Sequence, residues 1–171
     1  MDRHVIANMG TELGATTSLF PSDQRTLEFL DENGRADCWV ELAADDGAAY
    51  DVSDDIDLSR IEPLIATPSS PDNVVPVRDV AGRPVYQSYI GSSANPGYRD
   101  FAVPALMVRE RPIAPGLSFD INPSTRQVLA NLTGEGLLTH LIAAGGRIHQ
   151  AGCNGCMGMG QAPASGKNSL R

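Results

Sequence analysis

The sequence predicts an α/β protein with a three-layer, mainly parallel sheet and flanking helices. After Gly82, strand patterns alternate with helix patterns, the strands at residues 85–91, 117–121 and 146–150 and the helices at residues 98–109, 123–132 and 136–143. Strands that alternate with helices favour a parallel sheet with right-handed crossovers. Loops of small residues also follow the first and third strands, and open parallel sheets carry their chemistry beyond the carboxyl ends of their strands.

Two helices are predicted near the N-terminus. Apolar residues recur at helical spacing over residues 3–13, which predicts a helix with one buried face. Ser22 is a good N-cap for a second helix, and Asn33 with Gly34 is a typical stop signal. Together these helices define a helical N-terminal segment, residues 1–42.

The composition changes in the segment that follows. Between Glu41 and Glu62, eight acidic residues accompany a single basic one, and three prolines come soon after. Acidic charge and proline at this density favour a solvated connection over a core. Residues 43–76 are therefore predicted to be an acidic, proline-rich linker with one short strand at residues 50–52. The α/β domain then occupies residues 77–171.

Composition and charge exclude several classes of protein. The chain has 171 residues, a hydrophobic fraction of 42% and a formal net charge of −8, which fits one domain, or one domain with a fragment of a neighbour. A negative field repels phosphate backbones, so no nucleic-acid partner is expected. The sequence has no apolar run of ~20 residues, as a membrane helix needs, no signal-peptide pattern, and an odd number of cysteines. We expect a cytoplasmic protein with no membrane partner and no disulfide scaffold.

The most informative local feature is a pair of cysteines, Cys153 and Cys156, on a loop rich in glycine. Glycines allow the backbone to approach a bulky group closely and offer N–H donors to its sulfur atoms. This pattern suits a metal–sulfur cluster. The spacing alone also fits half of a zinc site, a redox pair or two reduced structural cysteines, although the sequence has no second pair to complete a zinc site.

Two further patterns have a functional and a purely structural interpretation. The small-residue loop at residues 91–100 follows a strand and precedes a helix, so it could bind an anion or simply form a tight turn. Asn8 and Glu12 are four residues apart and share one helix face, where they could bind a hydroxyl group or water, or only face solvent. Cys38 has no nearby ligand-like partner and is expected to be structural.

Three segments, in this order, resemble the aconitase family of iron–sulfur hydro-lyases. Residues 7–18 (ANMGTELGATTS) resemble the family's NMGAExGATTS segment, residues 90–100 (IGSSANPGYRD) its IGSCTNSSYRD loop, and residues 152–160 (GCNGCMGMG) its CGPCIGMG loop. The resemblance covers essentially the whole chain. It implies an internal part of a larger enzyme, from the end of its second domain through most of its cluster-binding third domain.

The resemblance also implies which residues form the site. Cys153 and Cys156 match two of the three cysteines that hold a [4Fe-4S] cluster, whereas Ser93 stands where the family has its first cluster cysteine. Because a serine oxygen is harder and more basic than a thiolate, we expect a labile cluster or none. Asn8 and Glu12 match the family's catalytic pair near the departing hydroxyl group or water. Asn95 matches an asparagine beside the cluster.

By resemblance, the expected reaction is the conversion of citrate to isocitrate through cis-aconitate, as in the tricarboxylic acid cycle, with a tricarboxylate substrate. We expect the isolated chain to be inactive, because other family segments supply further active-site residues. One alternative is a cluster-free, non-catalytic α/β module for binding or structure. Another is a sister hydro-lyase that acts on isopropylmalate or homoaconitate. The expected partners are the missing enzyme domains or, through exposed apolar surface, a second copy of the chain.

Overall fold

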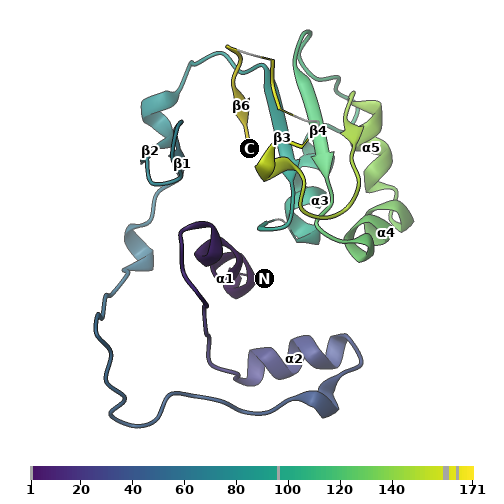
Figure 1. Cartoon of the computed structure of the whole chain (residues 1–171). Helices are drawn as coiled ribbons and strands as arrows, with labels where there is room; N and C mark the ends of the chain where they lie inside the picture. The colour runs from purple at the N-terminus through teal and green to yellow at the C-terminus, as the bar shows by residue number, and fades with distance from the viewer. Residues whose placement is uncertain (1, 96, 160–161, 165) are drawn as a thin grey trace. The chain divides into compact units, whose positions relative to one another are not determined.

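The computed structural model describes residues 2–95, 97–159, 162–164 and 166–171. They form two compact units (Figure 1). One unit combines the N-terminal helix α1 (Asp2–Glu12) with residues Gly82–Arg171, and the other comprises Leu13–Ala81. The first helix therefore belongs to the same unit as the sheet. The domain boundaries expected after residues 42 and 76 stay a prediction.

The larger unit is built on a parallel sheet. In the described part of the chain, this sheet has four strands in the order β5-β4-β3-β6, and each neighbouring pair is parallel. The strands are β3 (Gln87–Gly91), β4 (Ser118–Asn122), β5 (Arg147–Ile148) and β6 (Ser169–Leu170). The predicted α/β class with a parallel sheet and flanking helices is confirmed. Strand β6 lies beyond the last predicted strand and adds an edge next to β3.

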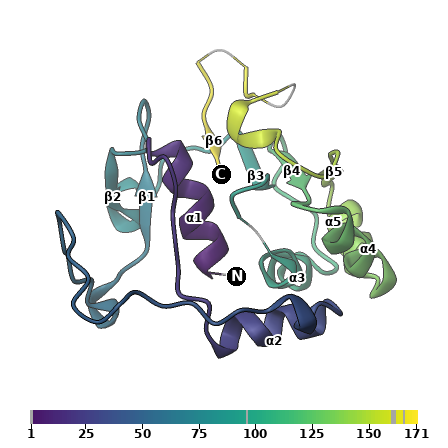
Figure 2. The ribbon, with the colours of Figure 1, turned by 60° about the horizontal axis from the view of Figure 1, so that its bottom comes forward.

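Three helices connect the strands and cover one face of the sheet: α3 (Tyr98–Met107), α4 (Arg126–Gly134) and α5 (Leu137–Ala143). Thr125 caps the N-terminus of α4, because its side-chain oxygen accepts a hydrogen bond from the Val128 N–H at 3.1 Å. Figure 2 shows α4 and α5 side by side, in agreement with their many mutual contacts. Helices α3 and α5 lie within the predicted ranges 98–109 and 136–143, and α4 overlaps the predicted range 123–132.

The apolar core lies between these helices and the sheet. Phe119 and Ile121 point from β4 toward the helices, because alternate residues of a strand face the same side. They pack with Phe101 of α3, Leu132 of α4 and Leu141 of α5, and four of these five side chains are fully buried. Burial of several large apolar side chains is the main force that holds such a layer together.

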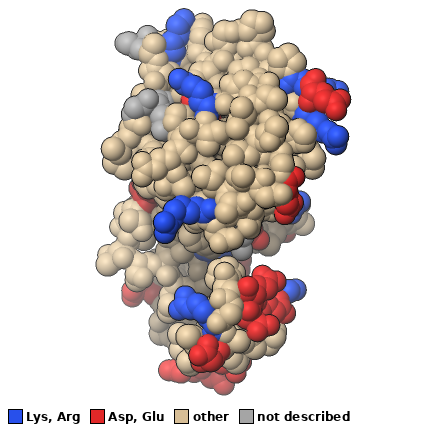
Figure 3. All heavy atoms as spheres, turned by 90° about the vertical axis from the view of Figure 1, so that its right-hand side faces the viewer, with Lys and Arg blue, Asp and Glu red and all other residues tan. Residues whose placement is uncertain are grey.

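The outer surface over α4 and α5 is mostly uncharged. The upper part of Figure 3, which views the right-hand side of Figure 1, shows few acidic or basic side chains there. Ile142 of α5 is 52% exposed.

Among the described residues, none of the helices combines the length and the apolarity that a membrane crossing requires.

Helix α1 confirms the helix predicted for residues 3–13, but its packing differs from the prediction. Within α1, all of whose residues are described, no side chain is buried, and Ile6 is 60% exposed. The expectation of a buried apolar face is therefore wrong. Asn8 of α1 donates a hydrogen bond to the Ser93 backbone oxygen, so the helix contacts the loop after β3 through a polar side chain.

The second unit contains helix α2 (Gln24–Glu32) and a small antiparallel pair, β1 (Leu64–Ala66) and β2 (Val74–Pro76). Asp23 caps α2 in place of the predicted Ser22, because its carboxylate accepts hydrogen bonds from Arg25 N and Thr26 N.

The strand predicted at residues 50–52 is wrong. Tyr50 and Val52 lie outside any strand and are 66% and 84% exposed, because no neighbouring segment pairs with them. The strands of this segment form further along the chain. Residues 64–66 and 74–76 flank a proline-containing turn that brings them into antiparallel register.

Candidate functional site at the carboxyl edge of the sheet

The paired cysteines lie on the loop that follows β5, beyond the carboxyl edge of the parallel sheet. Cys153 precedes a single 3₁₀ turn, η4 (Gly155–Met157), and Cys156 lies within it. Both side chains are exposed, and their Sγ atoms are 3.6 Å apart. The turn therefore presents two thiols side by side to solvent, as the sequence pattern predicts for a site of sulfur chemistry.

Asn122, at the end of β4, fixes the cysteine loop to the sheet. Its side chain is fully buried, and its Nδ2 donates to the backbone oxygens of Gln150 at 2.7 Å and Gly152 at 3.2 Å. Its Oδ1 accepts hydrogen bonds from the Tyr89 hydroxyl at 2.7 Å and the Gly155 N–H at 3.3 Å. One amide side chain thus forms hydrogen bonds with backbone groups on both sides of Cys153, and these bonds restrict the conformation of the loop.

The ring of Tyr89 packs directly under the loop. A Cβ atom built on Gly155 would lie 2.2 Å from the Tyr89 ring, so the close approach requires glycine. Burial raises the pKa of Tyr89 to about 12, although the charge of Arg171 lowers it in part. Tyr89 therefore remains a protonated phenol that donates its hydrogen bond to Asn122 across the ordinary pH range.

The loop after β3 packs against the cysteine loop through Ser92. Ser92 is 3% exposed and has a positive φ of 87°, a conformation that is rare outside glycine. Its hydroxyl donates to Cys156 Sγ at 3.3 Å and accepts from the backbone N–H groups of Asn154 and Cys156, at 3.3 and 3.4 Å. Ser92 thus joins two loops that are about sixty residues apart in sequence.

Ser93 lies beside the first thiol. Hydrogen bonds from the Ser93 hydroxyl and from Cys156 hold the pKa of Cys153 below its ordinary value, and the negative charge of Glu12 opposes this shift. The Ser93 backbone oxygen also accepts a hydrogen bond from Asn8 Nδ2 at 3.4 Å. The loop position where the family has a cysteine therefore contacts both a thiol and helix α1.

Four of the six residues that the sequence predicts for the site are connected here by close contacts: Asn8, Ser93, Cys153 and Cys156. The fifth, Glu12, acts on Cys153 only through its charge. Asn95 has a different environment, because it lines a hollow of about 230 Å³ with Asp2, Val5 and Ile6 of α1 and with Asp100. The role expected for Asn95 beside a cluster stays a prediction. Pro96 lies outside the described residues.

Sequence reasoning missed Ser92 and Asn122. Each comes directly after the last residue of a predicted strand, Gly91 or Ile121, where polar side chains gather in a parallel sheet. That placement was the available signal. The hydrogen bonds themselves depend on which loops meet, and no local pattern encodes that.

A buried charged cluster lies on the sheet face below the loop. Asp120 is fully buried and accepts hydrogen bonds from Gln87, Ser118 and Arg147, the closest at 2.7 Å. His149 Nε2 lies 2.7 Å from Asp120 Oδ1, and its ring stacks on Tyr89. Burial alone raises the pKa of Asp120, but the hydrogen bonds of its polar neighbours outweigh this and lower the pKa to about 2.

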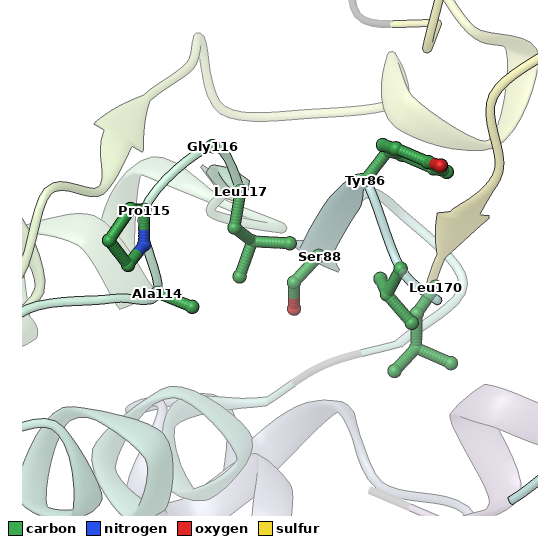
Figure 4. A pocket seen from close by; sticks show the side chains of 8 residues that line it. Tyr86, Ser88, Ala114, Pro115, Gly116, Leu117 and Leu170 are labelled. Atoms are coloured by element: carbon green, nitrogen blue, oxygen red, sulfur yellow. The ribbon is translucent and has the colours of Figure 1, made fainter. Parts of the chain in front are cut away.

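A second hollow, of about 540 Å³, lies at the opposite, amino-terminal edge of the sheet (Figure 4). Its wall is largely apolar and comes from β3, β6 and the segment before β4: Val85, Tyr86, Ser88, Ala114, Pro115, Gly116, Leu117 and Leu170. It has no cluster of polar side chains that would orient a substrate. The cysteine loop is therefore the better candidate for chemistry.

The fold and the site together define an α/β protein whose parallel sheet carries paired thiols, a serine loop and an amide–carboxylate helix face at one edge. The chain belongs to the aconitase family: the sequence model described as "Aconitase family (aconitate hydratase)" matches residues 1–87 and 79–170. The resemblance inferred from the three motifs is confirmed.

Several relatives match almost the whole chain. The 3-isopropylmalate dehydratase large subunit 2 of Archaeoglobus fulgidus is 34% identical over 160 residues, which are 94% of this chain and 38% of the relative. The large subunits of Elusimicrobium minutum and Nitratidesulfovibrio vulgaris are 34% and 36% identical over 92% and 91% of the chain, and over 38% and 37% of their own lengths. The chain thus spans somewhat more than a third of these relatives.

The donor atoms at the cysteine loop do not match a cluster held by three cysteines. Two thiols occupy two of the expected positions, and the third position offers the Ser93 hydroxyl. Within the described residues, no group of three or more His, Cys, Asp or Glu side chains gathers where it could hold a metal. A hydroxyl oxygen is a poor substitute for a soft thiolate at an iron–sulfur centre.

Proposed function

We propose that this chain forms part of the active site of an aconitase-family hydro-lyase that acts on a hydroxy acid of the isopropylmalate type. The observation that carries the proposal is the Asn8–Ser93 hydrogen bond, which joins helix α1 to the loop after β3 across 85 residues of sequence. The names of the relatives, 3-isopropylmalate dehydratase large subunits, support the substrate class. The dehydration of a hydroxy acid is the reaction that such a name describes.

The residues of α1 suit the two tasks of a dehydration. A base must take the proton from one carbon, and a polar group must hold the hydroxyl that leaves the next carbon. Glu12 supplies a carboxylate close enough to Cys153 to act on its pKa. Asn8, one helical turn earlier, supplies an amide beside Ser93. We assign proton transfer to Glu12 and binding of the hydroxyl group or water to Asn8.

The relatives do not support the specific expectation of citrate, a tricarboxylate substrate and the tricarboxylic acid cycle. Their names favour the sister reaction on isopropylmalate, which was one of the alternatives. Because these relatives are named as large subunits, the proposal includes a smaller partner subunit and the remaining segments of a large subunit. A cytoplasmic location and self-association through exposed apolar surface also remain proposals.

A second candidate function is a cluster-free module that binds a ligand without catalysis. Ser93 favours it, because the loop after β3 has a serine where the family has its first cluster cysteine. The two candidates make different predictions about Glu12. A proton-transfer role requires its carboxylate, whereas a binding module depends on the loops and the amide of Asn8.

Titration of the full chain with 3-isopropylmalate and, separately, with citrate would test the proposal. We expect 3-isopropylmalate to shift the backbone NMR signals of Asn8, Glu12 and Ser93, and citrate to shift them less. Glu12→Gln should weaken the response, whereas Glu32→Gln, on exposed α2, serves as a matched control. Equal responses to both acids, or shifts confined to other residues, would contradict the substrate assignment.

A further inference from the structure

We propose that Cys153 and Cys156 are a dithiol–disulfide pair, which closes reversibly to one disulfide when it meets an oxidised small-molecule disulfide of the glutathione class. The loop after β5 offers two thiols and the loop after β3 a serine, which is too few thiols for a three-cysteine cluster but sufficient for a disulfide. The redox pair goes beyond the proposed hydro-lyase activity and does not rest on it, because thiol–disulfide exchange at this loop requires no substrate.

The two sulfur atoms are already neighbours. The Sγ atoms of Cys153 and Cys156 are 3.6 Å apart. A disulfide bond is about 2.05 Å long, so rotation of the two side chains has to close a remaining ~1.5 Å. Two residues, Asn154 and Gly155, separate the cysteines, which is the spacing of many redox-active pairs. Contact and spacing together favour a bond within the loop.

The loop holds the pair together before any reagent arrives. The Asn122 side chain donates to the Gly152 backbone oxygen at 3.2 Å and accepts from the Gly155 N–H at 3.3 Å, so it fixes the backbone on both sides of Cys153. Ser92 accepts hydrogen bonds from two N–H groups of the same loop. Because the backbone is restrained, each thiol meets the other at a high effective concentration.

The exchange has two balanced steps. The thiolate of one cysteine attacks a sulfur atom of the oxidised reagent, so that a mixed disulfide forms and one reagent thiolate leaves. The thiolate of the other cysteine then attacks the protein sulfur of this mixed disulfide, which forms the Cys153–Cys156 bond and releases the second reagent thiolate. Two electrons pass from the pair to the reagent, and the two thiol protons go to the two released thiols.

The closed pair should be easy to reduce again. Both thiols are exposed, so small thiols reach the pair in either state. The bond closes a ring of only four residues, so it removes little entropy from the unfolded chain and adds little stability. Exposed disulfides are typically the labile ones. The redox state of the pair therefore decides whether this edge of the sheet offers two thiols or none.

Anaerobic equilibration of the full chain in glutathione buffers, followed by acid quenching and peptide mass mapping, tests the proposal. Cys38 is the internal control, because it is an exposed thiol in the other unit whose Sγ lies 3.8 Å from an Asp37 carboxylate oxygen. At a fixed concentration of reduced glutathione, we expect the peptide with Cys153 and Cys156 to lose two hydrogens and carry no glutathione. Half-closure should need about tenfold less oxidised glutathione than half-modification of Cys38, and excess reduced glutathione should restore both thiols.

Three variants separate a redox pair from two independent thiols. Cys153→Ser and Cys156→Ser should each keep glutathione on the remaining thiol, at the oxidant concentration that modifies Cys38. Asn122→Ala, with its fold checked by circular dichroism, should need about tenfold more oxidant for closure, because the loop is no longer held. The wild-type and single-cysteine results decide the proposal even if Asn122→Ala loses its fold. Glutathione on both site cysteines of the wild type, disulfides between chains, or closure no easier than modification of Cys38 would overturn it.

Discussion

The two faces of strand β4 differ sharply although they come from alternate residues of one five-residue segment. Phe119 and Ile121 pack into an apolar core against three helices. Asp120 and Asn122 face the opposite side, where they are equally buried but form hydrogen bonds to charged and backbone groups. One face of the strand therefore stabilises the fold, and the other connects the sheet to the cysteine loop.

The polar face of β4 explains how the sheet supports a site at its edge. Apolar packing is tolerant of shape and has no direction, so it fixes the layers but not the orientation of a loop. The Asn122 amide offers directional hydrogen-bond donors and an acceptor. A buried polar group costs free energy unless its donors and acceptors all have hydrogen-bond partners. The loop conformation that satisfies Asn122 is therefore strongly preferred, and the thiols take their positions from it.

The apolar face should account for the largest effect on stability. Ile121→Ala removes a fully buried side chain between β4 and the helices and should lower the free energy of unfolding by about 2–5 kcal/mol. Urea denaturation followed by circular dichroism measures this loss. A loss well below 1 kcal/mol would mean that the helices do not pack on β4 as described.

The polar face should make stability depend on acid pH. The pKa of Asp120 is about 2 in the folded chain against an ordinary value of 3.8. A lowered pKa stabilises the fold above the ordinary value, and this stabilisation, about 2 kcal/mol, is lost as the pH falls from near 4 toward 2. The stability difference between the wild type and Asp120→Asn should shrink over this window. A difference independent of pH would contradict the buried ionised carboxylate.

The smallest effect on the free energy of unfolding is expected where Asn122, on the polar face of β4, forms hydrogen bonds with the cysteine loop. Tyr89→Phe keeps the ring under Gly155 but removes the hydroxyl that donates to Asn122. The expected loss is about 1 kcal/mol, as for one net hydrogen bond, together with faster alkylation of Cys153 and Cys156 relative to Cys38. If alkylation of all three thiols accelerates equally, the change reflects general unfolding instead of release of the loop.

The sequence was sufficient for the parts of the fold that depend on local patterns. The strand and helix patterns after Gly82 correspond to β3, β4, β5 and the helices between them. In contrast, no sequence pattern predicted the strand pair β1 and β2 within residues 64–76. Strand β6, Ser169–Leu170, has no strand pattern in the sequence around it. Its pairing with β3 depends on the return of the chain to the sheet, which is a tertiary event.

The candidate site follows the same rule. The thiols and the Asn8–Glu12 pair are visible as sequence patterns, and the structure brings the thiols and Asn8 to the two loops at one edge of the sheet. Ser92 and Asn122 are functionally placed only because two loops meet across the sheet. Serine and asparagine at strand ends have many purely local roles, such as caps and turns, so their type alone carries little information.

We expect Ser93 to decide whether the two thiols of the cysteine loop can hold a cluster. Anaerobic reconstitution with iron and sulfide, followed by counts of both per chain, tests it most directly in the wild type and in Ser93→Cys. We expect the wild-type chain to retain no stable [4Fe-4S] cluster and Ser93→Cys to retain one. A wild-type chain that keeps iron and sulfide in the proportions of a [4Fe-4S] cluster would contradict it.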